Sequence, residues 1–279
     1  MKTRIIFNSK AHSYVEGSNI TYSSVSKLIE KYKQAFDADY WITYKAYQRL
    51  LGEDFKSYKQ GYKLQDKALF SHLKQFVKIK ELNKAKKDIK QEWLDEKNKS
   101  ILKGNTYHTY KEQQSKDEGF CLNTNCNRNF RTVESTIITI KDNVEYREPS
   151  VSSLKDLSDG FHPELILWNK KFKLAGQADK VFIETIDGVR YIDIDDYKTN
   201  KAIKKANFFG KMKAPLHHLD DCNYNHYRLQ ISTYAWMLEQ EGFVVRSTRF
   251  THLNKVYDFD YMKHEVELML GLEEQDNSL

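Results

Sequence analysis

The sequence is poor in residues that break regular structure, and it contains no long apolar run. Its 279 residues include only 3 prolines and 11 glycines, which excludes a collagen-like chain or an extended flexible linker. No stretch of about 18 apolar residues occurs, and the opening MKTRIIFNSK lacks the apolar centre of a secretory signal. We therefore expect a cytoplasmic protein that has no membrane partner.

Cysteine is also sparse, and the three examples are Cys121, Cys126 and Cys222. An odd number of cysteines without a CxxC pair argues against a disulfide framework, a zinc ribbon and a four-cysteine iron–sulfur cluster. We expect no iron–sulfur cluster, and the low cysteine content is typical of a reducing compartment.

The sequence does contain enough apolar residues for a core, together with an uneven excess of basic residues. It is 40% hydrophobic, and its net charge is +6. Residues 56–116 hold 16 lysines and 7 acids, a net +9, whereas residues 258–279 hold one lysine and 7 acids, a net −6. A local basic cluster indicates a polyanionic partner. The alternative is that these lysines only solvate the outer faces of helices.

The hydrophobic pattern changes from helical to alternating at about residue 131. Before that point it predicts a hairpin and then helices, over residues 4–22, 25–36 and 38–118. A polar loop is expected over residues 118–131. The alternating segments that follow predict strands, then a helix over residues 223–241 and a final strand.

This order of elements predicts the α/β class, with an α+β-like mixed sheet and a helical elaboration at the N-terminus. We expect a single domain over residues 1–279. Its expected parts are a hairpin with a Lys-rich helical elaboration (1–103), a core (104–257) and an acidic C-terminal tail (258–279).

One hairpin carries the clearest local signal in the chain. Asp187-Gly188 lies between two alternating runs, and this dipeptide is typical of the type I′ turn, in which both central residues need a positive φ. With this turn, Lys180 faces Asp195 on the other strand. Opposite charges in facing positions stabilise an antiparallel pair, so the register is chemically consistent.

The same register brings two carboxylates and a lysine together at one end of the hairpin. It places Asp179 opposite Asp196, with their Cβ atoms about 5 Å apart, and Lys198 shares the face of Asp196. The rest of this face is apolar, and core-facing acids are costly unless they are paired or bind a metal. Carboxylate oxygens suit Mg²⁺. The alternative is a surface hairpin with scattered charges.

Four motifs around this hairpin occur in the order of a known family. Gly176–Asp179 resembles a GxxD motif, Asp196–Thr199 a (D/E)xK motif in the form DYKT, Gln230–Tyr234 a QxxxY motif, and Gly104–His108 a GxxxH helix. Over residues 104–253 the chain therefore resembles the RecB-like branch of the PD-(D/E)XK nuclease superfamily.

The N-terminal residues match this family less specifically. Phe7, His12 and Tyr14, in the pattern FxxxxHxY, resemble the opening of its phage members.

The resemblance implies a restriction-endonuclease-like core with the order α-β-β-β-α-β, and Mg²⁺ or Mn²⁺ as the cofactor. It implies that His108, Asp179 and Asp196 are metal ligands, with the backbone carbonyl of Tyr197 as a fourth. Glu164 is a further candidate ligand, because the family often has an acid on the strand before GxxD.

The resemblance also implies that Asp179, Asp196 and Lys198 carry the catalysis, Lys198 by orienting and activating the attacking water. A lysine-rich stretch and a helix with aromatic residues follow in the sequence, and they suit phosphate contacts and base stacking. The expected nucleic-acid contacts are Gln230, Tyr234, Tyr227, Arg228, Lys201, Lys204 and Lys205. The alternative for Gln230 and Tyr234 is ordinary packing of an amphipathic helix.

We therefore expect a metal-dependent deoxyribonuclease, an exonuclease of phage or mobile-element DNA replication and recombination, acting in a bacterial host cytoplasm. The expected partners are single- or double-stranded DNA and a helicase or annealing protein. One alternative is a catalytically silent DNA-binding or helicase-associated assembly protein with the same fold, against which the intact set of Asp179, Asp196 and Lys198 argues. The other alternative is an RNA-directed nuclease.

Overall fold

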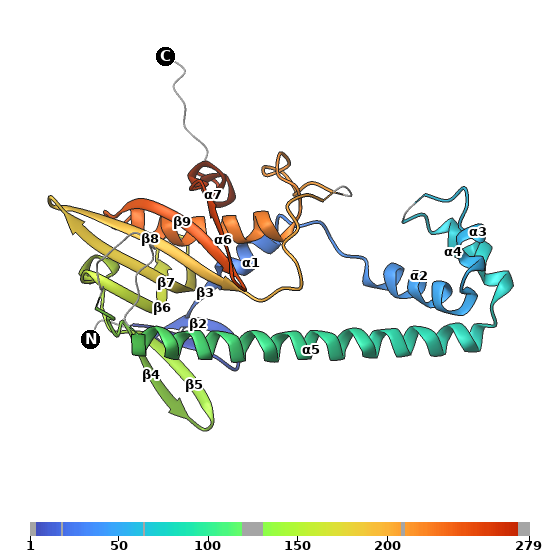
Figure 1. Ribbon diagram of the computed structural model, residues 1–279, viewed down its shortest axis with the longest axis horizontal. Coiled ribbons are helices and arrows are strands. Elements are labelled where there is room, and N and C mark those ends of the chain that lie inside the picture. The colour runs from blue at the N-terminus through green and yellow to red at the C-terminus, as the bar shows by residue number, and fades with distance from the viewer. Residues whose placement is uncertain (1–3, 18, 64, 119–130, 208–209, 273–279) are drawn as a thin grey trace, which may run out of the picture. The chain divides into compact units, whose positions relative to one another are not determined.

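The computed structural model describes residues 4–17, 19–63, 65–118, 131–207 and 210–272 (Figure 1). The chain forms two compact units, residues 1–34 with 105–279 and residues 35–104. We expected residues 1–103 to elaborate one domain, but residues 1–34 belong to the unit that carries the core. The expected polar loop lies almost wholly outside the described residues, as do Cys121 and Cys126. Cys222 is buried.

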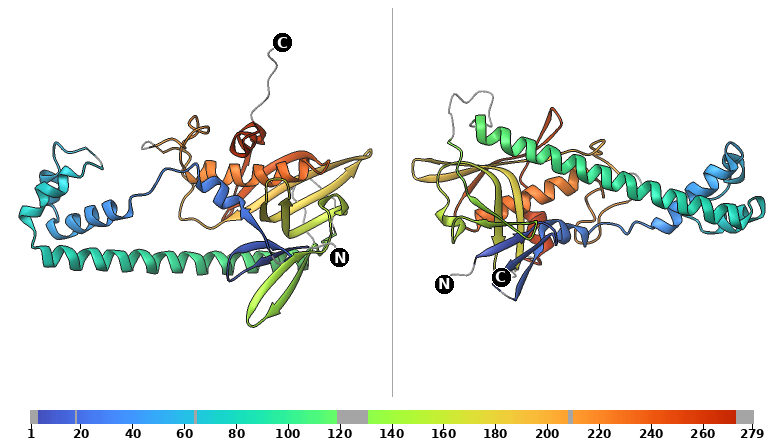
Figure 2. Two further views of the ribbon diagram at one scale, coloured as in Figure 1. Left: turned by 180° about the vertical axis from the view of Figure 1, so that it is seen from behind. Right: turned by 90° about the horizontal axis from the view of Figure 1, so that it is seen from below.

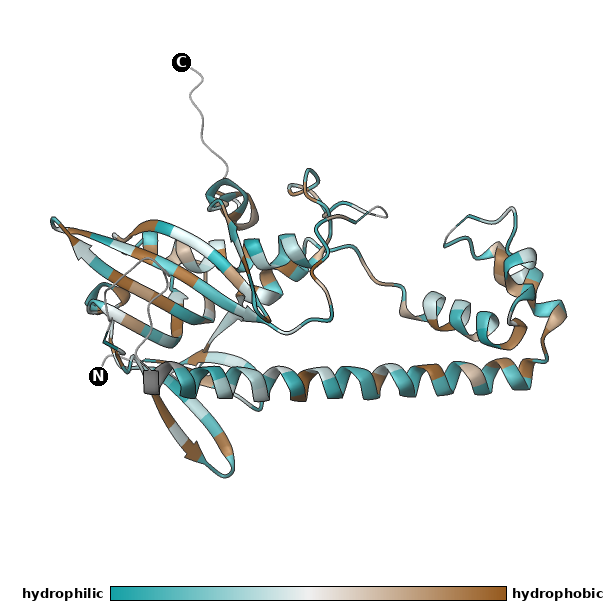
Figure 3. Cartoon of the chain, in the orientation of Figure 1, coloured by the Kyte–Doolittle hydropathy of each residue, from teal (hydrophilic) through white to brown (hydrophobic). Residues whose placement is uncertain are grey.

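Residues 35–104 form a helical unit with its own core, as the helical pattern predicted. Its helices are α2 (Ala38–Leu51), α3 (Asp54–Tyr58), α4 (Ala68–Leu73), the 3₁₀ helix η1 (Lys74–Phe76) and the first part of α5 (Ile79–Glu118). Side chains from these helices make the core: Tyr40, Tyr44, Tyr47, Phe55, Leu69, Leu73 and Ile89. Most residues of α5 are hydrophilic, as its lysine content predicts (Figure 3).

The other unit is built on a mixed, mostly antiparallel sheet with ten strands among the described residues. The order along the sheet is β10 (Lys255–Phe259), β9 (Val244–His252), β8 (Val189–Lys198), β7 (Leu174–Ile186), β3 (Ile20–Ser24), β2 (Ser13–Glu16), β1 (Ile5–Asn8), β5 (Val144–Pro149) and β4 (Thr136–Lys141). Strand β6 (Gly160–Asn169) also pairs with β7. The expected α/β class with a mixed sheet is confirmed.

Helix α6 (Asn223–Glu239) packs on strands β6 to β9 (Figure 2). Its apolar residues join the inward face of the β7–β8 hairpin in one core, which contains Val181, Ile183, Ile192, Ile194, Leu229, Trp236 and Leu238. Short helices α1 (Val25–Glu30) and α7 (Lys263–Leu270) pack against α6. None of the helices in the described residues is both long enough and apolar enough to cross a membrane.

The expected acidic tail is wrong for most of its length. Residues 258–270 form the end of β10 and helix α7, because Val266 and Met269 bury their side chains in the core. Residues 273–279 lie outside the described part of the chain.

The expected N-terminal hairpin is also wrong in detail, because the segment forms the three strands β1, β2 and β3. Its middle strand, SYVE, alternates buried and partly exposed side chains and pairs with both neighbours. Ser24 caps α1 and accepts a hydrogen bond from the Lys27 N–H at 3.2 Å. The helix ends at Glu30, earlier than the expected residue 36.

The predicted register of the β7–β8 hairpin is confirmed from Ile186↔Val189 to Lys180↔Asp195. Lys180 and Asp195 are both buried and form an ion pair. The ladder ends at this pair, just before Asp179 and Asp196 would face each other.

A gap opens along the β7 edge at the point where this ladder ends. On the same edge, β3 pairs in parallel with the start of β7, at Leu174 and Ala175. Residues 176–179 therefore pair with neither β3 nor β8. The sheet divides at the GQAD segment, and this division makes room for a cavity.

Candidate functional site

A cavity of about 340 Å³ lies at the gap between β3 and β8. It brings together residues that are far apart in the sequence and that we predicted as one site. Those in its lining are His108, Glu164, Asp179, Asp196, Lys198, Gln230 and Tyr234.

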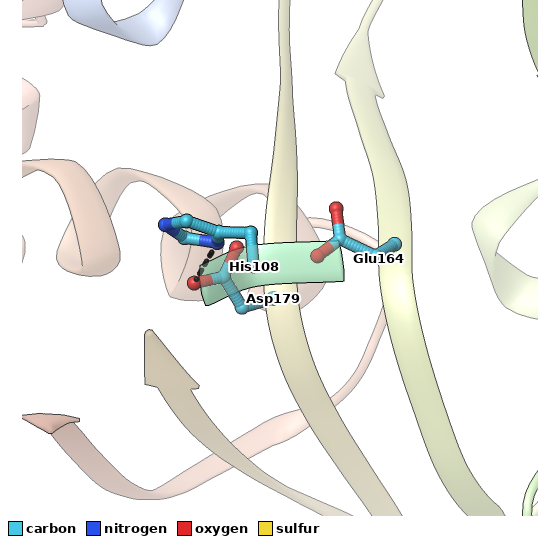
Figure 4. A group of neighbouring side chains, drawn as sticks. All are labelled: His108, Glu164 and Asp179. Atoms are coloured by element: carbon cyan, nitrogen blue, oxygen red, sulfur yellow. Dashed lines mark ion pairs between the residues drawn. The ribbon is translucent and has the colours of Figure 1, made fainter. Parts of the chain in front are cut away.

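Three of these residues form a compact group of candidate metal ligands. His108 comes from α5, Asp179 from β7 and Glu164 from the neighbouring strand β6 (Figure 4). One ligand atom from each lies within 4.8 Å of the others, and His108 Nδ1 is 3.3 Å from Asp179 Oδ2. One imidazole and two carboxylates suit Mn²⁺ as well as Mg²⁺.

Glu164 takes a backbone conformation that few non-glycine residues adopt. Its φ is +50°, and the β6–β7 ladder passes directly from Pro163↔Lys180 to Leu165↔Ala178. Glu164 thus interrupts the ladder at the position that would face Asp179. Such backbone strain is concentrated at functional sites, where the surrounding structure holds it in place.

Two residues that the sequence analysis missed hold the Glu164 carboxylate. Gln177 Nε2 donates to Glu164 Oε2 at 2.6 Å, and Arg147 Nη1 lies 3.4 Å from the same oxygen. Arg147 comes from β5 and also pairs with Glu145 at 2.5 Å. Arg147 reaches the site because β5 pairs with β1, and nothing in the local sequence predicts that pairing.

Asp196 lies at the end of a chain of hydrogen bonds that leads to α6. Lys198 Nζ donates to Asp196 and also to Gln230 Oε1 at 3.0 Å. Gln230 Nε2 in turn donates to the Tyr234 hydroxyl at 2.9 Å. The strand and the helix therefore hold the Lys198 ammonium between a carboxylate and an amide.

Burial and close charges shift the ionisation of the whole group. Burial lowers the pKa of His108, but the hydrogen bond and charge of Asp179, with the charges of Asp196 and Glu164, raise it to about 9. Burial and the charge of Asp179 raise the pKa of Asp196 to about 6. Burial and Asp179 likewise raise the pKa of Glu164 well above its usual value.

The two remaining groups stay charged near neutral pH. Burial alone would raise the pKa of Asp179, but the hydrogen bond and charge of His108, with the charge of Lys198, lower it. Burial would lower the pKa of Lys198, but the charges of Asp196 and Asp179 raise it. Without a metal, protonated His108 and Lys198 therefore balance part of the negative charge of the acids in the site.

Metal binding is expected to release protons from His108 and Glu164, whose pKa values are both raised. Because the folded-state pKa of His108 is raised from 6.5 to about 9, its charged pair with Asp179 stabilises the metal-free fold fully below about pH 6.5. That contribution is lost as the pH rises through about 9. A metal ligand must be deprotonated, so Mn²⁺ affinity should rise over the same range.

Isothermal titration of Mn²⁺ in buffers of different ionisation enthalpy measures this release. We expect at least one proton per metal near pH 7.5 and fewer near pH 9.5. The His108→Asn variant should release fewer protons at pH 7.5. Equal proton release by the variant and the wild type would contradict the assignment of His108.

Tyr234 is buried, with 3% of its surface exposed, and packs directly on Gly176. A Cβ atom at position 176 would lie 2.4 Å from Tyr234 Cε1. The first residue of the GxxD motif therefore has to be glycine so that α6 can approach β7. Such packing is the alternative role that we considered for Tyr234. A contact between Tyr234 and nucleic acid stays a prediction.

The Gly176→Ala variant is expected to lose about 1–3 kcal/mol of unfolding free energy, because its methyl group overpacks the Tyr234 ring. It should also weaken the hydrogen bonds that Gln230 makes. Urea unfolding measures the loss. Gly210→Ala is the control, since a Cβ there would meet only Gln34 Cγ at 3.5 Å, an ordinary contact. Equal stability of the two variants would contradict this account.

The other predicted nucleic-acid contacts are not in the described lining of this cavity. Lys198 Nζ lies 4.7 Å from the centre of the Tyr227 ring. Arg228 contacts the Tyr224 ring and lines a different cavity. The remaining three are exposed on the segment between β8 and α6: Lys201, Lys204 and Lys205.

Tyr197 contributes a backbone N–H and an aromatic ring to the site, in addition to the carbonyl that we predicted as a metal ligand. Its N–H donates to Asp179 Oδ2 at 2.6 Å, where a strand partner would otherwise accept. Its ring packs against the Tyr107 ring of α5 at 5.7 Å, next to His108 in the sequence. The role of its carbonyl as a metal ligand stays a prediction.

Comparison with known sequences assigns no family to this chain. No protein-family model matches it, and no curated protein matches it significantly. Any statement of its function therefore depends on the geometry of the cavity and on the motifs that line it.

Proposed function

We propose that the protein is a metal-dependent deoxyribonuclease with a PD-(D/E)XK core, which hydrolyses DNA phosphodiester bonds. The observation that carries this proposal is the gathering of His108, Glu164, Asp179, Asp196 and Lys198 around one cavity. As the motifs suggest, we further propose an exonuclease of phage or mobile-element replication and recombination.

The order of elements around the cavity supports this core. Helix α5 supplies His108, strands β6, β7 and β8 follow it, and then come α6 and β9. This succession supports the proposed order α-β-β-β-α-β, with the hairpin β4–β5 between the first helix and these strands. The GxxxH motif lies in α5, GxxD in β7 and QxxxY in α6, which also supports the proposal.

The donor set fits a divalent cation. His108, Glu164 and Asp179 would hold Mg²⁺ or Mn²⁺, with Asp196 and the Tyr197 carbonyl as further candidates. When bound, such a cation neutralises charge on the phosphate and makes water more acidic. The repulsion between these buried carboxylates favours a cation at the same place.

Lys198 would act as a cation rather than as a proton acceptor. Its pKa is raised by Asp196 and Asp179, so it keeps its proton at neutral pH. Asp196 and Gln230 hold its ammonium in the cavity. A fixed positive charge there stabilises the negative charge that develops on the phosphate and orients the attacking water.

Exposed basic residues that follow β8 in the sequence support a nucleic-acid substrate. The exposed lysines 201, 204 and 205 follow the catalytic strand, where they can contact a phosphate backbone. Binding that depends on such contacts weakens steeply with salt. The Lys-rich helix α5 could bind DNA in the same way, or a helicase or annealing protein.

The deciding experiment compares the wild type with Asp196→Asn on end-labelled oligonucleotides. Single-stranded DNA, double-stranded DNA and RNA of one sequence are each incubated with EDTA, Mg²⁺ or Mn²⁺. We expect only the metal-loaded wild type to degrade DNA, in a ladder that starts at one end. DNA binding without cleavage by the wild type would favour the catalytically silent alternative, and cleavage of RNA alone would favour the RNA-directed one.

A further inference from the structure

We propose that the cavity has a second wall that binds the phosphate next to the scissile one, and that His12 is its main hydrogen-bond donor. We call this surface the donor wall and define it by His12, Ser24 and Ser26. The proposal rests on the proposed function, because it assigns a further contact with the same substrate.

The donor wall is placed beside the candidate metal ligands by the branching of the sheet. His12 lies in the turn between β1 and β2, and Ser24 and Ser26 lie where β3 passes into α1. Ser24 pairs with Ala175 in the β3–β7 ladder, directly before Gly176. All three residues therefore line the same cavity as Asp179 and Lys198.

The two parts of the cavity lining differ in charge. The acids in its lining are Glu164, Asp179 and Asp196, which all come from the adjacent strands β6, β7 and β8. The donor wall contributes an imidazole and two hydroxyl groups. The Ser24 oxygen accepts from the Lys27 N–H, so its own hydrogen can still be donated. Imidazole and hydroxyl donors suit a phosphate oxygen.

His12 is exposed, lines the cavity and contacts a buried aromatic ring. Its φ is +51°, in the left-handed region that histidine, like asparagine and aspartate, adopts in tight turns. The Phe7 ring packs against the imidazole at 5.4 Å, in a T-shaped arrangement. The turn and the Phe7 ring together hold the imidazole in the cavity lining.

The donor wall fits the sugar–phosphate backbone better than a base. Base binding needs an accessible aromatic face for stacking. The two aromatic rings beside His12 are those of Phe7 and Tyr14, which are only 7% and 6% exposed. The contact should therefore be independent of base sequence.

A role in metal binding does not explain His12. Among the described residues, the ligand atoms that lie within 4.8 Å of one another belong to His108, Glu164 and Asp179. His12 variants should therefore bind Mn²⁺ like the wild type, which also shows that they are folded.

The test uses single-stranded oligonucleotides that carry one uncharged methylphosphonate linkage. His12→Gly removes the donor without strain, His12→Asn keeps a donor and tolerates the positive φ, and His217→Asn is the control at another exposed histidine. Cleavage is mapped at each linkage on both sides of the modification. Binding of the same oligonucleotides is measured by fluorescence anisotropy in Ca²⁺.

The wild type should cut about tenfold more slowly at one linkage beside the methylphosphonate, since a hydrogen bond to a charged group is lost. His12→Gly should be about tenfold slower on ordinary DNA, with no further loss from the methylphosphonate. His12→Asn should recover much of the activity, and His217→Asn should match the wild type.

The remaining outcomes distinguish a failure of the donor wall from a failure of the proposed DNA hydrolysis. Independent, additive effects of His12→Gly and the methylphosphonate at both flanking linkages would overturn the donor wall. Wild-type binding without cleavage would overturn the proposed hydrolysis, whereas a loss of binding in His12→Gly would still support the donor wall. Absence of both binding and cleavage in the wild type would overturn both proposals.

Discussion

Replacing Lys198 with methionine is expected to reduce DNA cleavage by about 10²–10³-fold, because the variant loses a fixed charge that stabilises the transition state. Mn²⁺ affinity should be retained or increased. The Lys198 ammonium competes with a metal for the carboxylates of Asp196 and Asp179, and methionine has a similar length but no charge. Single-turnover cleavage and isothermal titration measure the two effects separately.

The control for this variant is Lys201→Met, which makes the same change at an exposed lysine three residues further along the chain. It should bind Mn²⁺ normally and lose much less activity. Thermal unfolding in saturating Mn²⁺ checks that Lys198→Met is folded. Cleavage by Lys198→Met at a rate near that of the wild type would remove Lys198 from the catalytic group.

The Asp179→Asn variant is expected to lose both Mn²⁺ binding and cleavage. Asp179 contacts His108 and is part of the candidate ligand group, so its loss should weaken metal binding by more than the roughly 10–100-fold that is typical of outer-shell changes. The pKa of His108 should also fall from about 9, because its hydrogen bond with the carboxylate is the largest influence that raises it. NMR titration of the imidazole measures this change.

An asparagine at position 179 can still accept the Tyr197 N–H through its side-chain oxygen, so the strand geometry should be kept. Asp142→Asn is the matched control. It makes the same chemical change at an exposed turn, where φ is +52° and asparagine is well tolerated. Normal Mn²⁺ binding by Asp179→Asn would show that the ligand group is elsewhere.

The β7–β8 hairpin was predictable because its determinants are local. Asp187-Gly188 defines the turn, and alternation along the two strands decides which side chains face the core. Lys180 then faces Asp195, as predicted. A short loop closes with little loss of chain entropy, so neighbouring residues in the sequence are enough to specify it.

The helices were predictable in type but not in their limits. Apolar periodicity identified α6, and the structure ends it at Glu239, close to the expected residue 241. The net charge of residues 258–279 led us to expect an acidic tail, and it obscured the buried positions of Val266 and Met269 in α7. Average charge describes a surface, whereas a few apolar residues decide whether a short helix packs.

The sequence by itself determined which chemical groups are available and the register of one hairpin. The hairpin register brought Asp179, Asp196 and Lys198 together, and the family resemblance added His108 and Glu164 as candidates. Local turn chemistry and side-chain alternation depend on neighbouring residues, so they can be read along the chain.

Only the tertiary structure decided how these groups are supported and what faces them. The branching of the sheet at β7 opens the cavity, and the pairing of β5 with β1 brings Arg147 to Glu164. The same branching places His12 in the cavity lining. These arrangements depend on contacts between segments more than a hundred residues apart, whose partners are selected by the packing of the whole core rather than by any local pattern.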